Sequence, residues 1–109
     1  MSKAKQLSGH TFQSQVLDAE GPVLVDFYAD WCAPCRAQAP IVDQLAGEYD
    51  GRVAVGKVDV DSETALAAQY QVRSIPSLVL FHRGEVVEQL VGAHSAQTLR
   101  GRLDALLAA

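Results

Sequence analysis

The two cysteines of the chain, Cys32 and Cys35, constrain its fold more than any other feature. They follow residues 23–29, a run of β-branched and aromatic side chains that predicts a buried strand. Residues 36–45 have the spacing of a helix face, so the pair lies where a strand turns into a helix. Pro34 suits the first turn of that helix, where its missing N–H is not needed. Thiols at positions i and i+3 of such a turn are close enough to form a disulfide.

A helix start is also a place where thiols become reactive. Its free N–H groups and the positive end of the helix dipole stabilise a thiolate, which makes Cys32 the expected nucleophile. Cys35 lies one turn further in and is the expected resolving thiol. The residues between them, Ala33 and Pro34, are neutral. The nearby acids Asp26 and Asp30 disfavour a second negative charge. Both facts favour a disulfide reductant over a strong oxidant.

Two other uses of a Cys pair remain open at this point. A structural disulfide is one, but a bridge over so short a loop stabilises a fold by only roughly 2 kcal/mol. A zinc site is the other, and it needs two further ligands. The three histidines, at positions 10, 82 and 94, do not have metal-ligand spacing, so we expect no metal.

Composition narrows the class of protein. The 109 residues, 49% of them hydrophobic, are enough for a packed core, so we expect a single domain over residues 1–109. A formal charge of −4 gives no basic surface for nucleic acid or anionic membrane. No stretch reaches the roughly 20 apolar residues of a membrane helix. Residues 1–6 lack the apolar region of a secretion signal, which favours the cytoplasm.

The order of predicted elements indicates an α/β fold with a mixed sheet covered by helices on both faces. The expected strands are an edge strand near residues 5–7, the buried strand at 23–29, and strands at 53–58, 78–81 and 85–91, with a hairpin turn at Arg83-Gly84. Four helices are expected. The first is short and capped by Thr11, and the second runs from the cysteines to about residue 49 with a kink at Pro40. The third is capped by Asp61 or Ser62, and the last is capped by Ser95 and has an apolar stripe of Leu99, Leu103, Leu106 and Leu107.

Several longer stretches of the sequence match the pattern of one known family. VDFYADWCAPCRAQAP, VGKVDVDS, VRSIPSLVLF and GEVVEQLVGA, at these separations, resemble the thioredoxin family from about residue 7 to residue 107. The resemblance implies the thioredoxin fold, a three-layer α/β/α arrangement with a central mixed five-stranded sheet and four flanking helices. Two positions differ from the usual pattern: Ala33 replaces a glycine, and Tyr28 stands where many members have a second tryptophan. Alanine favours the helix by roughly 1 kcal/mol over glycine, so we expect a tuned redox potential and unchanged chemistry.

The resemblance also implies an activity. It predicts a thiol–disulfide oxidoreductase that reduces protein disulfides and is re-reduced by a thioredoxin reductase using NADPH. The chain has no glycine-rich nucleotide motif, so no cofactor is expected to be bound. A monomer is expected. The alternative is a thioredoxin-fold binding or holdase subunit that acts without turnover; a dedicated oxidant is less favoured by the neutral Ala33-Pro34 pair.

Asp26 is the first of two expected helpers of the cysteines. It lies in an apolar run typical of a buried parallel strand, so its carboxyl should be desolvated and its pKa raised. In thioredoxins the matching residue takes a proton from the resolving cysteine through water, and the resemblance extends that role to Asp26. It likewise implies that Lys57 pairs with Asp26. The alternatives are a solvated strand-edge acid and a lysine whose head reaches water.

The remaining expected site residues would contact the substrate. Pro76 resembles the cis-proline of the family, although only about 5–6% of X–Pro bonds are cis in general. Such a bond would turn the backbone of Ile75 outward to pair with an extended substrate segment. Trp31, Gly92 and Ala93 would complete a flat apolar rim around the nucleophile, with a core position for Trp31 as the alternative.

Overall fold

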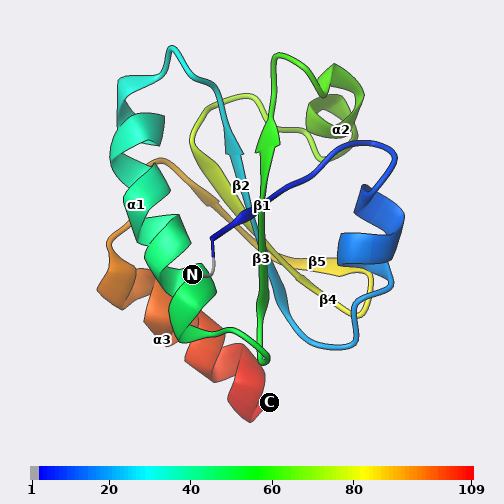
Figure 1. Ribbon diagram of the computed structural model, residues 1–109, viewed down its shortest axis with the longest axis vertical. Helices are drawn as coiled ribbons and strands as arrows, with labels where there is room; N and C mark the ends of the chain where they lie inside the picture. Colours follow the sequence, from blue (N-terminus) through cyan, green and yellow to red (C-terminus); the bar gives the residue numbers. More distant parts are fainter. Residues whose placement is uncertain (1–2) are drawn as a thin grey trace.

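The computed structural model describes residues 3–109, which form one mixed sheet flanked by helices (Figure 1). Among these residues no helix is both long and apolar enough to span a membrane. In chain order the elements are β1 (Lys5–Gln6), the short π-helix η1 (Gln13–Leu17), β2 (Val23–Tyr28), α1 (Ala33–Glu48), β3 (Ala54–Asp59), α2 (Thr64–Gln69), β4 (Ser77–His82), β5 (Glu85–Val91) and α3 (Ala96–Ala108).

The sheet has the strand order β1-β3-β2-β4-β5. Strands β1, β2 and β3 are parallel, whereas β4 runs antiparallel to β2 and β5 antiparallel to β4. The hairpin between β4 and β5 turns at Arg83 and Gly84, both with positive φ (55° and 83°), as a tight hairpin turn requires. The mixed sheet with a final hairpin is the predicted arrangement. Because β2 is central, its carboxyl end delivers the chain to the cysteines from the most buried position of the sheet.

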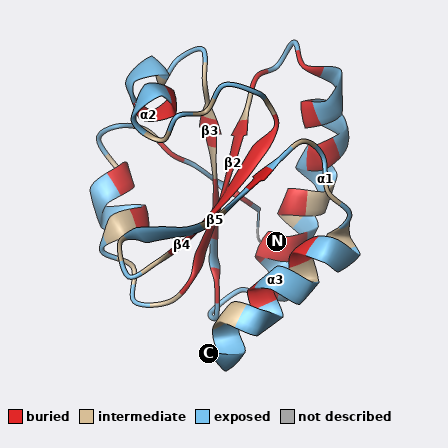
Figure 2. Ribbon diagram, turned by 180° about the vertical axis from the view of Figure 1, so that it is seen from behind, coloured by how far each residue is buried: buried red, intermediate tan, exposed pale blue. Residues whose placement is uncertain are grey.

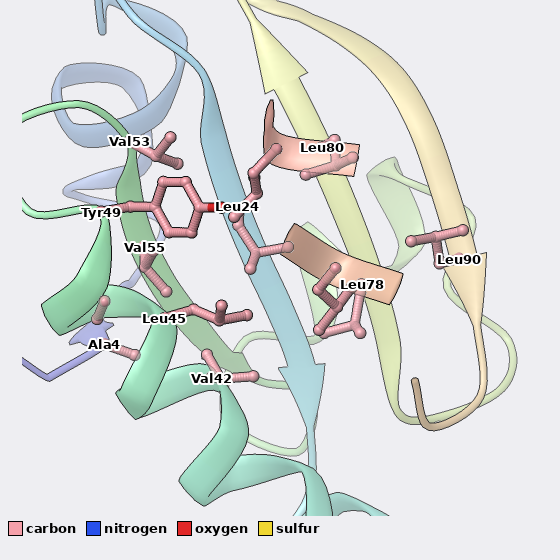
Figure 3. Close-up of a cluster of buried hydrophobic side chains, with 13 residues drawn as sticks. Ala4, Leu24, Val42, Leu45, Tyr49, Val53, Val55, Leu78, Leu80 and Leu90 are labelled. Carbon is pink, nitrogen blue, oxygen red and sulfur yellow. The ribbon is translucent and has the colours of Figure 1, made fainter. Parts of the chain in front are cut away.

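Helices cover both faces of this sheet. Figure 1 shows α1 and α3 on one side and η1 with α2 on the other, while Figure 2 shows that β2 and β4 between them are largely buried. Between α1, α3 and the sheet lies a cluster of buried hydrophobic side chains, shown in Figure 3, that includes Leu24, Leu45, Leu78, Leu99 and Leu103. The opposite face packs an aromatic group, in which the rings of Tyr70 and Phe81 meet edge-on at 5.2 Å. The three-layer thioredoxin fold with its five-stranded sheet and four helices is therefore confirmed.

The last helix begins as predicted. Ser95 is its N-cap, and the Ser95 hydroxyl accepts a hydrogen bond from the Thr98 N–H at 3.1 Å. Leu99 and Leu103 are buried, as the apolar stripe requires. Leu107 is 37% exposed, so the prediction is wrong for this residue. It follows Leu106 directly, and one residue turns the side chain about 100° around the helix, away from the core.

The start of α2 differs from the prediction. Its N-cap is Glu63, with no side-chain capping bond, and neither Asp61 nor Ser62 caps the helix. The Ser62 hydroxyl instead donates to the Asp59 carbonyl at 3.3 Å, and the Asp61 carboxylate binds Trp31. Both side chains are engaged in the loop before the helix, which leaves the helix start to its backbone.

The first short helix also lacks the predicted cap. Its N-cap is Phe12, without a side-chain capping bond. The Thr11 hydroxyl oxygen accepts from the Ser8 N–H at 3.0 Å, so Thr11 closes the preceding turn rather than the helix. The Phe12 and Val16 side chains of this segment are buried.

Candidate active site

Cys32 and Cys35 are joined in a disulfide at the start of α1. Cys32 is the N-cap residue in an extended conformation, and Ala33 and Pro34 form the first turn. The Cys35 N–H donates to the Cys32 Sγ at 3.3 Å, so a backbone donor of the helix start already points at the first sulfur. Both residues are largely buried, with Cys32 5% and Cys35 2% exposed. Cys32, the residue predicted to be the nucleophile, is thus the more exposed residue of the pair.

This arrangement suits thiol chemistry for a physical reason. The N–H that reaches Cys32 in the disulfide is a group that can stabilise a thiolate after reduction, and the 16-residue helix adds its dipole. Since β2 and β3 are parallel, their carboxyl ends meet at the same edge of the sheet as the start of α1 (Figure 1). That edge is where open α/β sheets place their reactive groups.

A second segment closes against the disulfide from β4. The Cys32 Sγ lies 3.8 Å from the Ile75 carbonyl oxygen. The Ile75–Pro76 peptide bond is cis, as the resemblance implied. The Pro76 carbonyl accepts a hydrogen bond from the Gly92 N–H at 2.8 Å. The reactive pair, the proline loop and the segment after β5 are therefore one connected structure.

Trp31 stands next to this structure with its ring in solvent. It is 69% exposed, and its indole Nε1 donates to the Asp61 carboxylate at 2.8 Å. The alternative of a core tryptophan is excluded by this exposure. Ala93, on the segment after β5, is also exposed. The sequence reasoning missed Asp61 as the partner of Trp31, because an aspartate shortly before a helix has the same pattern as a cap.

Asp26 lies near the centre of β2, the strand whose carboxyl end leads to the cysteines. It is 3% exposed, and its Oδ1 is a buried oxygen without a hydrogen-bond partner. Desolvation raises the pKa of the Asp26 carboxyl from 3.8 to about 7, against a lowering by Lys57 and with a smaller rise from Asp43. The predicted burial and raised pKa are confirmed. At neutral pH this carboxyl is poised between its neutral and charged forms, which is what a proton carrier needs.

The partner expected for Asp26 is close in the sheet but forms no tight ion pair. Lys57 is the register partner of Asp26 in β3. In the described part of the chain the ion pairs are Arg100–Glu48 and Arg102–Glu88, so Lys57 and Asp26 do not meet within salt-bridge distance. The Lys57 ammonium lies 5.7 Å from the ring centroid of Tyr28.

Asp26 and Lys57 line the same small cavity. It has a volume of about 40 Å³, and its lining includes Asp26, Asp43, Lys57 and Tyr28. That volume exceeds the roughly 10–15 Å³ that one water occupies by the same measure, and the lining is polar enough to bind one. The sequence reasoning missed Asp43, which reaches this cavity from α1 and also accepts from the Ala4 N–H at 3.1 Å. No local pattern distinguishes it from a solvent-facing helix acid.

The metal alternative has no counterpart in this geometry. Both cysteine sulfurs are joined to each other, and residues 3–109 contain no group of three or more His, Cys, Asp or Glu side chains placed to hold an ion. What the arrangement can do chemically is pass between a disulfide and a dithiol. That change moves two electrons and two protons.

Comparison with known proteins agrees with this chemistry. The family model for thioredoxin matches residues 3–105. The chain is 47% identical to thioredoxin 1 of Nostoc sp. over 104 residues, which are 95% of this chain and 97% of that protein. It is 46% identical to a thioredoxin of Synechocystis sp. over 98% of this chain and the whole of that protein, and 53% identical to thioredoxin C-2 of Corynebacterium nephridii over 85% of this chain and 86% of that protein. The chain belongs to the thioredoxin family, and its Cys32–Cys35 pair makes it a dithiol–disulfide oxidoreductase that reduces protein disulfides.

Proposed function

We propose that Cys32 attacks the substrate disulfide, that Cys35 resolves the mixed disulfide, and that Asp26 manages the proton of Cys35. The observation that carries this assignment is the helix start, where Cys32 is the N-cap and accepts a backbone N–H from Cys35. The donor favours the thiolate form of Cys32 in particular. Cys35, inside the first turn and less exposed, takes part only after Cys32 has bound a substrate sulfur, and it then attacks the Cys32 sulfur.

The electrons balance over two exchanges. The Cys32 thiolate forms a bond to one substrate sulfur, the substrate S–S bond breaks, and the other substrate sulfur leaves as a thiolate that takes up a proton. Cys35 then loses its proton and attacks the Cys32 sulfur, which releases the second substrate thiol. The substrate has gained two electrons and two protons, and the protein is left with the Cys32–Cys35 disulfide.

Asp26 is the proposed acceptor of the proton that Cys35 loses. Its pKa of about 7 suits a group that must take up a proton at neutral pH and give it back later in the cycle. The cavity beside it could hold a water that carries this proton to the buried carboxyl. The positive charge of Lys57, across the parallel register, opposes the effect of burial and lowers the pKa of the Asp26 carboxyl.

The substrate surface is proposed to be the exposed ring of Trp31 together with Ile75, Pro76, Gly92 and Ala93. The Ile75 carbonyl oxygen lies 3.8 Å from the Cys32 Sγ, and the Ile75 backbone is proposed to pair with an extended substrate chain, as in strand addition. Ala33 and Pro34 lie between the sulfurs and are proposed to tune the redox potential without adding charge.

The setting of the cycle follows from its chemistry. The disulfide left on the protein must be reduced, and we propose a thioredoxin reductase fed by NADPH as the partner that does so. A reductant of this kind works in a reducing compartment, so we propose the cytoplasm. We also propose that residues 1–109 act as one domain and as a monomer, since the residues around Cys32 must be free to receive a substrate. Neither a nucleic acid nor a membrane is part of the proposal.

A coupled assay tests the proposal. The protein is mixed with NADPH, a thioredoxin reductase and insulin, and the loss of NADPH is followed. We expect turnover that depends on the protein and disappears when both cysteines are replaced by serine. A flat trace with a reductase known to be competent would contradict the proposal. A double-serine variant that retained its cellular function would instead support a binding subunit without turnover.

A further inference from the structure

Gln38 is a polar side chain buried in α1, one turn after Cys35. It is 1% exposed. Its amide makes two hydrogen bonds with one residue 56 positions later: Nε2 donates to the His94 carbonyl at 3.0 Å, and Oε1 accepts from the His94 N–H at 2.7 Å. The pair resembles the exchange of two bonds between strands of an antiparallel ladder. One side chain therefore ties the helix of the reactive cysteines to the segment between β5 and α3.

The segment that Gln38 holds is the one proposed to contact substrates. Gly92 and Ala93 directly precede His94. At its other end the segment is held by the Gly92 N–H, which donates to the Pro76 carbonyl at 2.8 Å. The His94 Nδ1 lies 2.9 Å from the Gly92 carbonyl oxygen and braces the turn from within. Gly92 has a φ of 93°, a conformation that glycine adopts without strain. Because glycine has no side chain, Gly92 does not itself restrict the backbone of this turn.

Apolar packing does not fix the distance between this segment and α1. A hollow of about 220 Å³ lies between them, lined by Ala37, Gln38, Ile41, Ala93, His94 and Ser95. The alanines on its two sides, Ala37 and Ala93, are both exposed and too small to close it. The two hydrogen bonds of Gln38 are the polar contact across this hollow. Both bonds are partly buried, so breaking them would leave the His94 N–H and carbonyl with poorer partners than the Gln38 amide supplies, which is unfavourable.

We propose that Gln38 is a positioning residue that fixes Gly92 and Ala93 relative to Cys32 and thereby sets the affinity for protein disulfides. The inference rests on the proposed substrate surface. Gln38 itself touches neither sulfur nor substrate. Its loss should therefore weaken the binding of a protein that uses the segment and leave the exchange chemistry unchanged. A small disulfide, which has no chain to lay against Gly92 and Ala93, should react at the same rate with or without Gln38.

The test uses Gln38→Met, which keeps the length and approximate volume of the side chain and removes its donor and acceptor. The pre-reduced protein is mixed with insulin or with hydroxyethyl disulfide, quenched with acid, and its remaining thiols are alkylated and counted by mass. We expect the half-saturating insulin concentration to rise roughly fivefold, with the limiting rate changed less than twofold. The rate constant for hydroxyethyl disulfide should not change.

The matched control is Gln44→Met, the same replacement at an exposed glutamine of α1 that donates to Glu48 on its own helix. It should leave both reactions unchanged. Gln38→Glu keeps an acceptor for the His94 N–H and loses the donor, so its insulin value should fall between those of the unaltered protein and Gln38→Met. If Gln38→Met does not fold, Gln38→Glu takes its place, with amide exchange of the His94 N–H in the unaltered protein as the second measurement.

Each outcome has a distinct meaning. An unaltered protein that reduces neither disulfide contradicts the proposed function itself. With the unaltered protein active, an insulin half-saturation that Gln38→Met and Gln38→Glu leave unchanged overturns the role of Gln38. An equal loss of rate with insulin and hydroxyethyl disulfide also overturns it, because the chemistry would then be what changed. So does exchange of the His94 N–H at the rate of a free peptide.

Discussion

Asp26 and Lys57 are register partners on the adjacent parallel strands β2 and β3, and the positive charge of Lys57 lowers the pKa that burial of Asp26 raises. Together the two effects give the Asp26 carboxyl a pKa of about 7, and without the lowering by Lys57 the pKa would be higher. Asp43 contributes a smaller rise from α1. The proton affinity of Asp26 is thus set jointly by three elements of the fold.

Replacing Lys57 by methionine should raise the pKa of Asp26 above about 7, because the one lowering influence of a neighbouring charge is removed. The carbon resonance of the Asp26 carboxyl, followed by NMR from pH 4 to pH 10, measures this directly. Lys5→Met, on the exposed edge strand β1, is the control and should leave the titration unchanged. An unshifted titration in Lys57→Met would show that the lysine head does not act on Asp26.

Replacing Asp26 by alanine should stabilise the protein at pH 8 and not at pH 3.5. The folded pKa of about 7 lies above the ordinary value of 3.8, so the folded state binds the proton more tightly than the unfolded chain. The resulting penalty is absent below pH 3.8, grows as the pH rises towards 7, and is constant above. About three pKa units correspond to roughly 4 kcal/mol. The methyl group leaves a small cavity, so we expect a net gain of about 2–3 kcal/mol.

Urea midpoints of the two proteins at pH 8 and pH 3.5 check this difference in stability. Asp50→Ala, at an exposed position after α1, is the control and should show no comparable gain. A variant that is less stable than the unaltered protein at pH 8 would mean that the Asp26 carboxylate is better solvated than its burial indicates.

The same replacement should slow the resolving step. Asp26 can accept the Cys35 proton only when it is ionised, so decay of the mixed disulfide should speed up as the pH rises through about 7. In Asp26→Ala this inflection should disappear and the decay at pH 7.5 should be slower by roughly a hundredfold, the lower end of general-base effects. Rapid-quench measurement of the mixed disulfide between pH 6 and pH 9 tests it. Equal profiles for both proteins would remove Asp26 from the mechanism.

The orientation of Trp31 should matter for substrate binding. Asp61→Ala removes the acceptor of the indole N–H, so the exposed ring gains freedom that substrate binding must then restrict. We expect a rise of roughly threefold in the half-saturating insulin concentration with little change in the limiting rate. Asp61→Asn keeps an oxygen acceptor and should have a smaller effect. Equal effects of Asp61→Asn and Asp61→Ala would point to the charge rather than the hydrogen bond, because both variants remove the charge and only Asp61→Asn keeps an acceptor.

Much of the fold was predictable because local rules decided it. The apolar run of β2, the positive-φ turn at Arg83 and Gly84, and the Ser95 cap each follow from neighbouring residues alone. The predicted caps failed where a side chain had a better partner. Asp61 accepts a hydrogen bond from a tryptophan 30 residues away, and no sequence pattern near Asp61 predicts that bond.

The site divides in the same way. The places of Cys32 and Cys35 and the burial of Asp26 follow from the sequence around them. The cis bond before Pro76 was foreseen only through family resemblance, since the local sequence favours trans. The two hydrogen bonds between Gln38 and His94 could not be predicted, because a glutamine in the middle of a helix usually faces solvent. Its partner is defined only once β5 and α3 are packed beside α1.

The division of labour between the two cysteines is tested most directly by trapping the mixed disulfide. Cys35→Ser and Cys32→Ser are each incubated with insulin and separated without reductant, and the covalent adducts are counted by mass. Cys35→Ser should accumulate an adduct on Cys32 that dithiothreitol removes, because nothing resolves it. Cys32→Ser should form essentially none, since the remaining thiol lies inside the first turn of α1. Equal amounts of adduct in the two variants would contradict the assignment of Cys32 as nucleophile and Cys35 as resolving thiol.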